Sequence, residues 1–270
     1  DLAPLVDQEA LKEFRSRALS PEHPVARGMA ENPDTFFTHR ESCNNYYDAV
    51  PAIVEDYMNK VSEITGRKYG LFSYYGAADA ERVIIAMGSV TEAIRETIDH
   101  LTAQGEKVGL VAVHLYRPFS AKHFLAAVPA TAKTIAVLDR TKEPGANGEP
   151  LYLDVKECFY GKENAPVIVG GRYGLGSNDT TPAQILAVYE NLALPEPKNQ
   201  FTLGIVDDVT FTSLPQKEEV AMGGEGMFEA KFYGLGADGT VGANKNSVKI
   251  IGDNTNKHCQ AYFSYDSKKS

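Results

Sequence analysis

The feature that most constrains the fold is an alternation of short apolar runs and amphipathic segments between residues 80 and 193. The apolar runs predict four strands, at residues 82–87, 108–115, 134–138 and 167–169. The segments between them place apolar residues at helical spacing and predict helices over residues 90–104, 121–127, 148–160 and 182–192. Because each strand is followed by a helix, we expect a mostly parallel sheet with helices covering both faces.

Two of these helices carry start signals. Ser89 and Glu92 have the spacing of a capping box, as do Thr181 and Gln184, and Pro182 suits a first helical position. We therefore expect both boxes to form. The glycine-rich run that follows the fourth strand, residues 170–176, predicts a flexible connection to the next helix.

The segments before residue 80 and between residues 193 and 228 do not show this alternation of strands and helices. Residues 1–75 read as helical with proline-rich breaks, including a helix over 48–65 that ends at Gly66. We expect Pro51 in the first turn of that helix or at a kink. Residues 196–227 read as a linker with a short edge strand at 201–206.

Residues 228–270 predict one βαβ unit, with strands at 228–232 and 261–265 around a helix over 240–251. A single unit cannot bury both faces of a parallel sheet, so we expect the rest of that domain to lie outside this sequence. The predicted fold class is therefore α/β, with one parallel-sheet domain followed by the start of a second α/β domain.

The best local signal for a binding site is the glycine-rich turn from Gly234 to Lys245, where the last predicted helix begins. Its glycines free the backbone, and the helix start presents unpaired N–H groups and the positive end of a dipole, as phosphate sites do. Asp238 is expected as the N-cap, and the close approach of a ligand would explain Gly242. The lysine content agrees, since residues 228–270 hold six lysines and four acids. A tight turn without a ligand is the alternative.

A dinucleotide site is a competing interpretation of the same turn. Gly234, Gly236 and Gly239 fit G-x-G-x-x-G, but Asp266 lies 32 residues after Gly234, later than the usual spacing of about 20 residues. Residues 139–142 follow a strand at the carboxyl edge, where α/β sheets bind ligands, although four polar residues there also suit a solvated turn.

Composition excludes several classes of protein. The 27 basic and 36 acidic residues give a net charge of −9, and no basic run favours nucleic acid or a membrane surface. No apolar stretch approaches the about 20 residues of a transmembrane helix. Cys43, Cys158 and Cys259 have no cluster or disulfide spacing, which favours a reducing, cytoplasmic location. The dispersed histidines have no metal spacing, and no self-contained catalytic constellation is present.

Three stretches resemble pyruvate:ferredoxin (flavodoxin) oxidoreductases of the 2-oxoacid:acceptor oxidoreductase family. They are EFRSRALSPEHPVARGMAENPDTFF (13–37), LDRTKEPGANGEPLYLDV (138–155) and FYGLGADGTVGANKNSVKIIGDNT (232–255), the last continuing into AYFSYDSKKS. The resemblance implies an internal fragment. Residues 1–75 would be the tail of a thiamine-diphosphate-binding domain, and 76–195 would resemble the transketolase C-terminal domain. Residues 196–227 would be a linker, and 228–270 the first βαβ unit of a domain like the separate gamma subunit of some relatives.

The resemblance also implies an activity. The family oxidatively decarboxylates pyruvate to acetyl-CoA and CO2, using thiamine diphosphate, Mg2+ and [4Fe–4S] clusters, and passes electrons to ferredoxin or flavodoxin. It further implies a homodimer. Cluster cysteines and the GDG–Asn motif of thiamine enzymes are absent from this sequence, so we expect the segment alone to be inactive and to scaffold the active site. Which 2-oxoacid is used stays open.

For the glycine-rich turn, the resemblance implies part of a coenzyme A site. The matching positions are Ala237, Asp238, Gly239, Thr240, Val241 and Lys269. Two alternatives remain: a non-catalytic subunit-assembly module in which the turn only serves packing, and an NAD-binding Rossmann protein.

Overall fold

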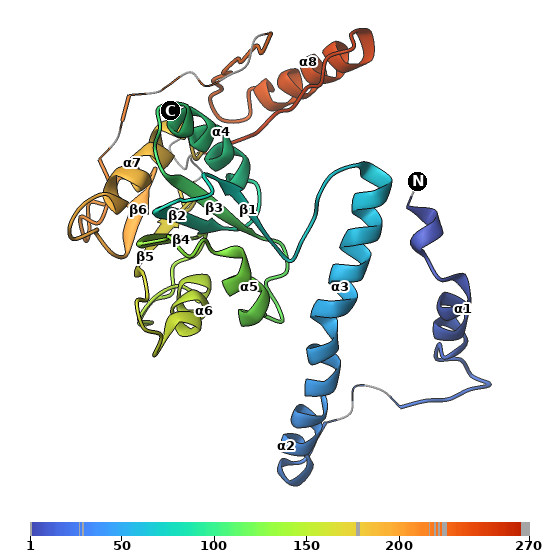
Figure 1. Cartoon of the computed structure of the whole chain (residues 1–270). Coiled ribbons are helices and arrows are strands. Elements are labelled where there is room, and N and C mark those ends of the chain that lie inside the picture. Colours follow the sequence, from blue (N-terminus) through green and yellow to red (C-terminus); the bar gives the residue numbers. More distant parts are fainter. Residues whose placement is uncertain are drawn as a thin grey trace. The chain divides into compact units, whose positions relative to one another are not determined.

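The structure is a computed structural model that describes residues 2–26, 28, 30–176, 179–215, 217, 218, 220, 222 and 226–265. The chain divides into two compact units (Figure 1). One unit comprises Asp1–Tyr75 and Val111–Ala130, and the other comprises Gly76–Leu110 and Thr131–Ser270.

The central element is a six-stranded sheet with the strand order β1-β3-β2-β4-β5-β6. Its strands are β1 (Phe72–Gly76), β2 (Arg82–Ala86), β3 (Val108–Val113), β4 (Thr134–Asp139), β5 (Val167–Tyr173) and β6 (Phe201–Leu203). The pairs β2–β4, β4–β5 and β5–β6 are parallel. The predicted α/β class with a mostly parallel sheet is confirmed.

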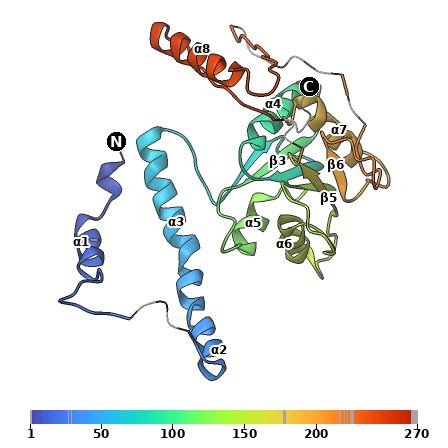
Figure 2. The same cartoon turned by 180° about the vertical axis from the view of Figure 1, so that it is seen from behind.

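Three helices of the second unit cover this sheet: α4 (Val90–Ala103), α6 (Pro150–Phe159) and α7 (Pro182–Leu192). Helices α4 and α7 pack together on one face, and α6 packs against β4 and β5 on the other (Figures 1 and 2). Fully buried aliphatic side chains fill the layers, among them Ile84, Ile94, Ile135, Leu151 and Val188. Each such side chain contributes about 1.5–3 kcal/mol through burial.

The two capping-box predictions have different outcomes. At the start of α7 the Thr181 N–H donates to Gln184 Oε1 at 3.3 Å, which is one of the two bonds of the expected box, whereas the Thr181 hydroxyl has no partner in the described chain. The prediction at Ser89 is wrong, because Ser89 has helical backbone angles and its side chain makes no capping bond. Helix α4 still starts at Val90, and the Thr91 hydroxyl donates to the Gly88 carbonyl at 2.7 Å instead.

Strand β5 is longer than expected and includes part of the predicted flexible connection. Gly170 and Gly171 are strand residues in register with β4. A Cβ on Gly171 would lie 2.3 Å from the Phe201 ring, and one on Gly170 would lie 3.1 Å from the Tyr152 ring. These glycines therefore allow close packing of neighbouring elements and do not mark a loop.

The first unit is mostly helical. Besides β1 and the end of β3, it contains η1 (Ala3–Leu5), α1 (Gln8–Ser16), α2 (Pro33–Ser42), α3 (Asn44–Thr65) and α5 (Ala121–Ala127). Helix α3 ends at Gly66 with a φ of 70°, as expected. It starts earlier than expected, because the Cys43 carbonyl accepts bonds from the Tyr46 and Tyr47 N–H groups. Pro51 therefore lies inside the helix and not in its first turn.

The last part of the chain differs from the predicted βαβ unit. Helix α8 (Thr240–Asn254) forms, but residues 226–265 contain no strand, so the strands expected at 228–232 and 261–265 are absent there. Their aromatic residues are exposed, with Phe228 at 86% and Tyr262 at 72%. A strand needs a neighbouring strand to satisfy its backbone groups, and none of the described residues supplies one.

Part of the predicted linker is ordered by one carboxylate. Asp207 accepts hydrogen bonds from the backbone N–H groups of Val209, Thr210 and Thr212 and from both threonine hydroxyls. These bonds, those from Thr210 first, hold the pKa of Asp207 well below its usual range. The loop also returns to β6, where the Thr202 N–H donates to the Thr212 carbonyl at 3.0 Å.

Candidate functional site

The glycine-rich turn leads directly into α8. Gly236 and Gly239 have φ values of 60° and 87°, a left-handed conformation that glycine adopts without strain. Helix α8 then starts at Thr240, and the Ala243 N–H donates to the Gly239 carbonyl at 3.0 Å. The N–H groups before Ala243 have no acceptor within the helix. The turn therefore presents backbone donors at the positive end of a 15-residue helix.

Asp238 closes the turn. Its carboxylate accepts hydrogen bonds of 2.9 Å from the N–H groups of Leu235 and Thr240. Bonds from the Thr240 side chain and backbone, and then from Leu235, lower the pKa of Asp238. The N-cap by backbone position is Gly239 and not Asp238 as expected, but Asp238 still binds a first-turn N–H. The negative charge of Asp238 repels an anion placed beside it, so an anion would bind nearer the N–H groups of Val241 and Gly242.

Gly234 and Gly242 differ in how much space a side chain would have at their positions. A Cβ on Gly234 would lie 2.5 Å from Thr240 Oγ1, so the turn itself requires Gly234. A Cβ on Gly242 would meet no heavy atom of the described chain within 4 Å. Glycine inside a helix costs about 0.5–1 kcal/mol relative to alanine. The described chain therefore gives no packing reason for glycine at position 242.

The turn brings most of the predicted site residues together. Ala237, Asp238 and Gly239 are exposed, and Thr240 and Val241 are half-buried. Lys245 lies one turn further along α8, and its Nζ is 5.6 Å from the centre of the Phe263 ring. Lys269 lies outside the described residues, and so does Asp266 of the dinucleotide alternative.

The second candidate region, residues 139–142, contains a structural carboxylate. Asp139 is only 6% exposed, and its two oxygens accept 3.0 Å bonds from the N–H groups of Leu151 and Tyr152. Burial raises the pKa of Asp139, and the two backbone bonds oppose that shift. Asp139 therefore caps the start of α6, and it is not part of a solvated turn. Arg140 is exposed, and its Nε donates to the Gly174 carbonyl at 3.3 Å.

The structure also buries two charged residues that the sequence did not point to. Glu149 is 2% and Arg172 8% exposed. Within the described part of the chain, Glu149 Oε2 and Arg172 Nε have no hydrogen-bond partner. Arg172 pairs in register with Asp139. The β4–β5 register places Arg172 beside Asp139, and Glu149 directly precedes α6, whose first turn Asp139 binds. Both positions depend on long-range packing, so no local sequence signal could have identified them.

No cluster of metal ligands is found in the part of the chain that the structure describes. It has no group of three or more His, Cys, Asp or Glu side chains that could hold a metal ion. The three cysteines are free. None of the described helices is long and apolar enough to cross a membrane.

Two protein-family models match the chain. The one described as "Pyruvate:ferredoxin oxidoreductase core domain II" matches residues 80–185. The one described as "Pyruvate flavodoxin/ferredoxin oxidoreductase, thiamine diP-bdg" matches residues 1–59. Both matches agree with the family that the three sequence stretches indicate.

Curated relatives align with the whole chain. Pyruvate-flavodoxin oxidoreductases of Klebsiella pneumoniae and Enterobacter agglomerans are 60% and 58% identical to it, and a pyruvate:ferredoxin oxidoreductase of Moorella thermoacetica is 58% identical. Each alignment covers 100% of this chain and 23% of the relative.

Among solved structures, a 2-oxoglutarate:ferredoxin oxidoreductase from Magnetococcus marinus is 21% identical, with a TM-score of 0.37. The match covers 62% of this chain and 27% of that one, and it is too distant to inform the site. The family models and the close relatives give the assignment. The chain belongs to the pyruvate:ferredoxin (flavodoxin) oxidoreductase family and corresponds to 23% of the length of the relatives that it matches.

Proposed function

We propose that this chain is a segment of an enzyme that oxidatively decarboxylates pyruvate. In that reaction pyruvate and coenzyme A give acetyl-CoA, CO2 and a proton, and two electrons pass to ferredoxin or flavodoxin. The observation that carries the proposal is the identity of 58–60% to pyruvate oxidoreductases over the whole chain. The segment acts together with the remaining domains of the enzyme, as a homodimer.

Within that enzyme the segment has two roles. The sheet of the second unit scaffolds the active site, while thiamine diphosphate, Mg2+ and the [4Fe–4S] clusters take their ligands from other parts of the enzyme. The glycine-rich turn supplies part of the coenzyme A site through Ala237, Asp238, Gly239, Thr240 and Val241, together with Lys269.

The geometry of the turn supports the coenzyme A role. Coenzyme A carries phosphate groups, and a helix N-terminus with free N–H groups is a suitable site for them. Asp238 already occupies the Thr240 N–H, which leaves the N–H groups of Val241 and Gly242 as donors. The open space beside Gly242 lets a ligand approach the backbone there.

Calorimetric titration of the chain with coenzyme A, and separately with NAD, tests this assignment. We expect binding of coenzyme A that Gly242→Val weakens about tenfold or more, because the new side chain occupies the ligand's approach. Gly252→Val is the matched control. It lies in the same helix, a Cβ there also meets nothing within 4 Å, and it is far from the turn.

The outcomes separate the candidate functions. Binding that falls only in Gly242→Val supports the coenzyme A role. Binding of NAD in place of coenzyme A would favour the dinucleotide alternative. Binding of neither ligand, with self-association of the chain, would favour the assembly module.

A further inference from the structure

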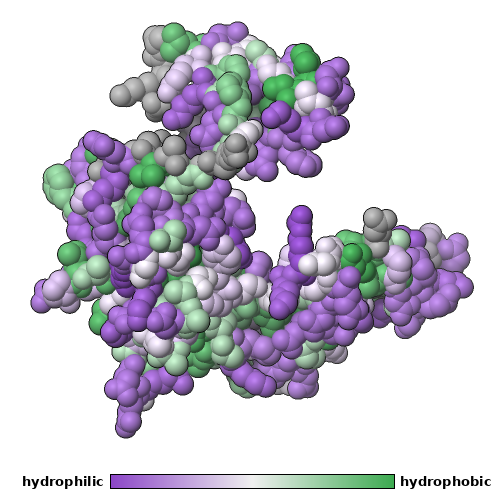
Figure 3. Space-filling view, turned by 45° about the horizontal axis from the view of Figure 1, so that its top comes forward, coloured by the Kyte–Doolittle hydropathy of each residue, from purple (hydrophilic) through white to green (hydrophobic). Residues whose placement is uncertain are grey.

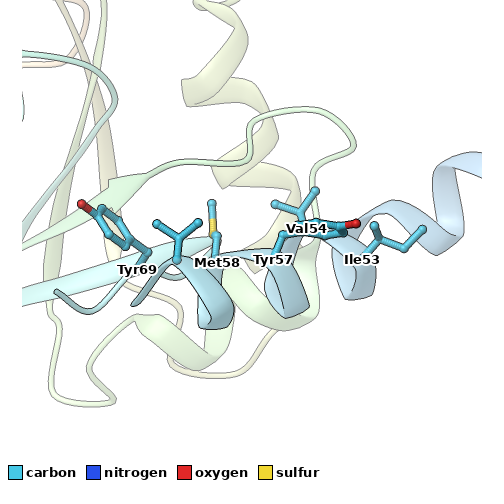
Figure 4. Close-up of a pocket in the computed structure, with 6 residues that line it drawn as sticks. Ile53, Val54, Tyr57, Met58 and Tyr69 are labelled. Atoms are coloured by element: carbon cyan, nitrogen blue, oxygen red, sulfur yellow. The ribbon is translucent and has the colours of Figure 1, made fainter. Parts of the chain in front are cut away.

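Helix α3 presents a continuous apolar face. Ile53, Val54, Tyr57, Met58 and Val61 recur at the spacing of one helical face, and Tyr69 follows the helix. Together these six residues line a groove without polar lining, which we call the α3 groove. In Figure 4 the labelled side chains follow one another along α3, with Tyr69 beyond its C-terminal end.

This face remains open within its own unit. Ile53 is 54%, Tyr57 43% and Tyr69 36% exposed. None of the helices α1, α2 and α3 has a buried residue. On the face that Figure 3 shows, hydrophilic residues predominate and apolar residues form small separate patches.

The opposite side of α3 is suited to water. Glu55, Asp56, Asn59 and Glu63 are exposed there, and Lys60 makes a 2.6 Å ion pair with Asp56. The helix is thus amphipathic, with one face for solvent and the α3 groove for a protein surface.

Three helices without a buried residue cannot form a stable domain, because a domain needs layers that bury a common core. The family model for the thiamine-diphosphate-binding domain matches residues 1–59 and ends inside α3. The close relatives are more than four times as long as this chain, since it covers 23% of their length. The part of their length that this chain does not contain can supply the missing core.

We propose that the α3 groove is covered by an apolar surface from the polypeptide that completes the thiamine-diphosphate-binding domain. This rests on the proposed function, in which the chain is one segment of the enzyme. The partner surface is apolar at its centre, to fill the groove between Met58 and Tyr69.

A second copy of this chain is the alternative occupant. It would bring only the same three helices, none of which has a buried residue, so it would not supply the core that the domain lacks.

The test compares Met58→Glu in the groove with Asn59→Glu, its neighbour on the solvent side of the same helix. Both variants are made in the full-length enzyme and in the 270-residue chain. In the full-length enzyme we expect residues 53–61 to be protected from hydrogen exchange. Met58→Glu should speed their exchange by about tenfold or more, whereas Asn59→Glu should leave it unchanged. In the chain alone, neither variant should change exchange there.

Two results would overturn the proposal. One is equal exchange of residues 53–61 in the full-length enzyme and the chain, since the groove would then be uncovered in both. The other is a dimer of the chain, seen by light scattering, that Met58→Glu dissociates, since a second copy would then occupy the groove. Acetyl-CoA formation by the wild-type full-length enzyme is measured separately. Its absence would refute the proposed function without changing the exchange result.

Discussion

Replacing Asp139 by alanine should destabilise the second unit strongly, because this buried carboxylate holds the start of α6 against β4. Both of its oxygens accept bonds from buried residues, the N–H groups of Leu151 and Tyr152, at 3.0 Å. In the alanine variant both N–H groups lose their acceptor where water does not reach them.

The magnitude follows from these two bonds. A buried donor left without a partner costs about 1–3 kcal/mol, which gives about 2–6 kcal/mol for the two groups. Removing the carboxylate also removes the cost of burying its charge, which offsets part of this loss. We therefore expect Asp139→Ala to lower the free energy of unfolding by about 2–4 kcal/mol. Asp139→Asn keeps one carbonyl acceptor and should lose about half as much.

Urea unfolding followed by far-UV circular dichroism measures these differences, and it suits a chain without tryptophan. Glu163→Ala is the control, because Glu163 is an exposed acid in a turn of the same unit. Its effect should stay within about 0.5 kcal/mol. If Asp139→Ala were as stable as the Glu163→Ala control, the assignment of Asp139 as the cap of α6 would be refuted.

Three further predictions concern the same unit. Burial raises the pKa of Asp139, so the folded state binds this proton more tightly than the unfolded state, and the resulting stability is full below the ordinary pKa of about 4 and is lost as the pH rises through the raised pKa. Wild type should therefore gain stability relative to Asp139→Asn as the pH falls from 7 to 4 in urea titrations. The same pH dependence of stability in both proteins would contradict the raised pKa. Gly171→Val should leave little folded protein, because a Cβ there lies 2.3 Å from the Phe201 ring; Gly252→Val, at a helical site where a Cβ meets nothing within 4 Å, should cost less, and equal circular dichroism melts of the two would contradict the packing argument. Asp207→Ala should make the loop around residues 205–213 sensitive to limited proteolysis, because five hydrogen bonds to its carboxylate are lost; unchanged cleavage would show that other contacts order the loop.

The order of strands and helices between residues 80 and 193 could be predicted because each element carries its own hydrophobic pattern within its own sequence. An apolar run such as 82–87 is too short for a helix, and the helix after it shows its apolar stripe within one turn of its start. The start of α8 was predicted correctly for the same reason, since the glycine-rich turn and the helix adjoin in sequence.

The errors arise where distant residues decide the outcome. Gly170 and Gly171 look like chain breakers, and only the rings of Tyr152 and Phe201 explain why glycine is needed in the strand. The segments 228–232 and 261–265 alternate as strands do, but the described residues offer no strand for them to pair with. Ser89 has capping-box spacing, yet its backbone is already helical, and its side chain accepts no bond from the N–H groups of the first turn.

For the candidate site, the sequence could locate the turn but not its internal bonds. Glycine spacing and the helix start are local signals. The hydrogen bonds from the Leu235 and Thr240 N–H groups to the Asp238 carboxylate depend on the conformation of the whole turn. Likewise, the burial of Asp139 follows from the packing of α6, which lies more than ten residues away in sequence.

The measurement that tests the central claim most directly is steady-state kinetics of the full-length enzyme carrying Gly242→Val, beside Gly252→Val and wild type. If the turn before α8 helps to bind coenzyme A for pyruvate oxidation, Gly242→Val should raise the KM for coenzyme A about tenfold or more. The KM for pyruvate should stay unchanged, and Gly252→Val should behave as wild type. A KM for coenzyme A that is the same in all three proteins would contradict the account.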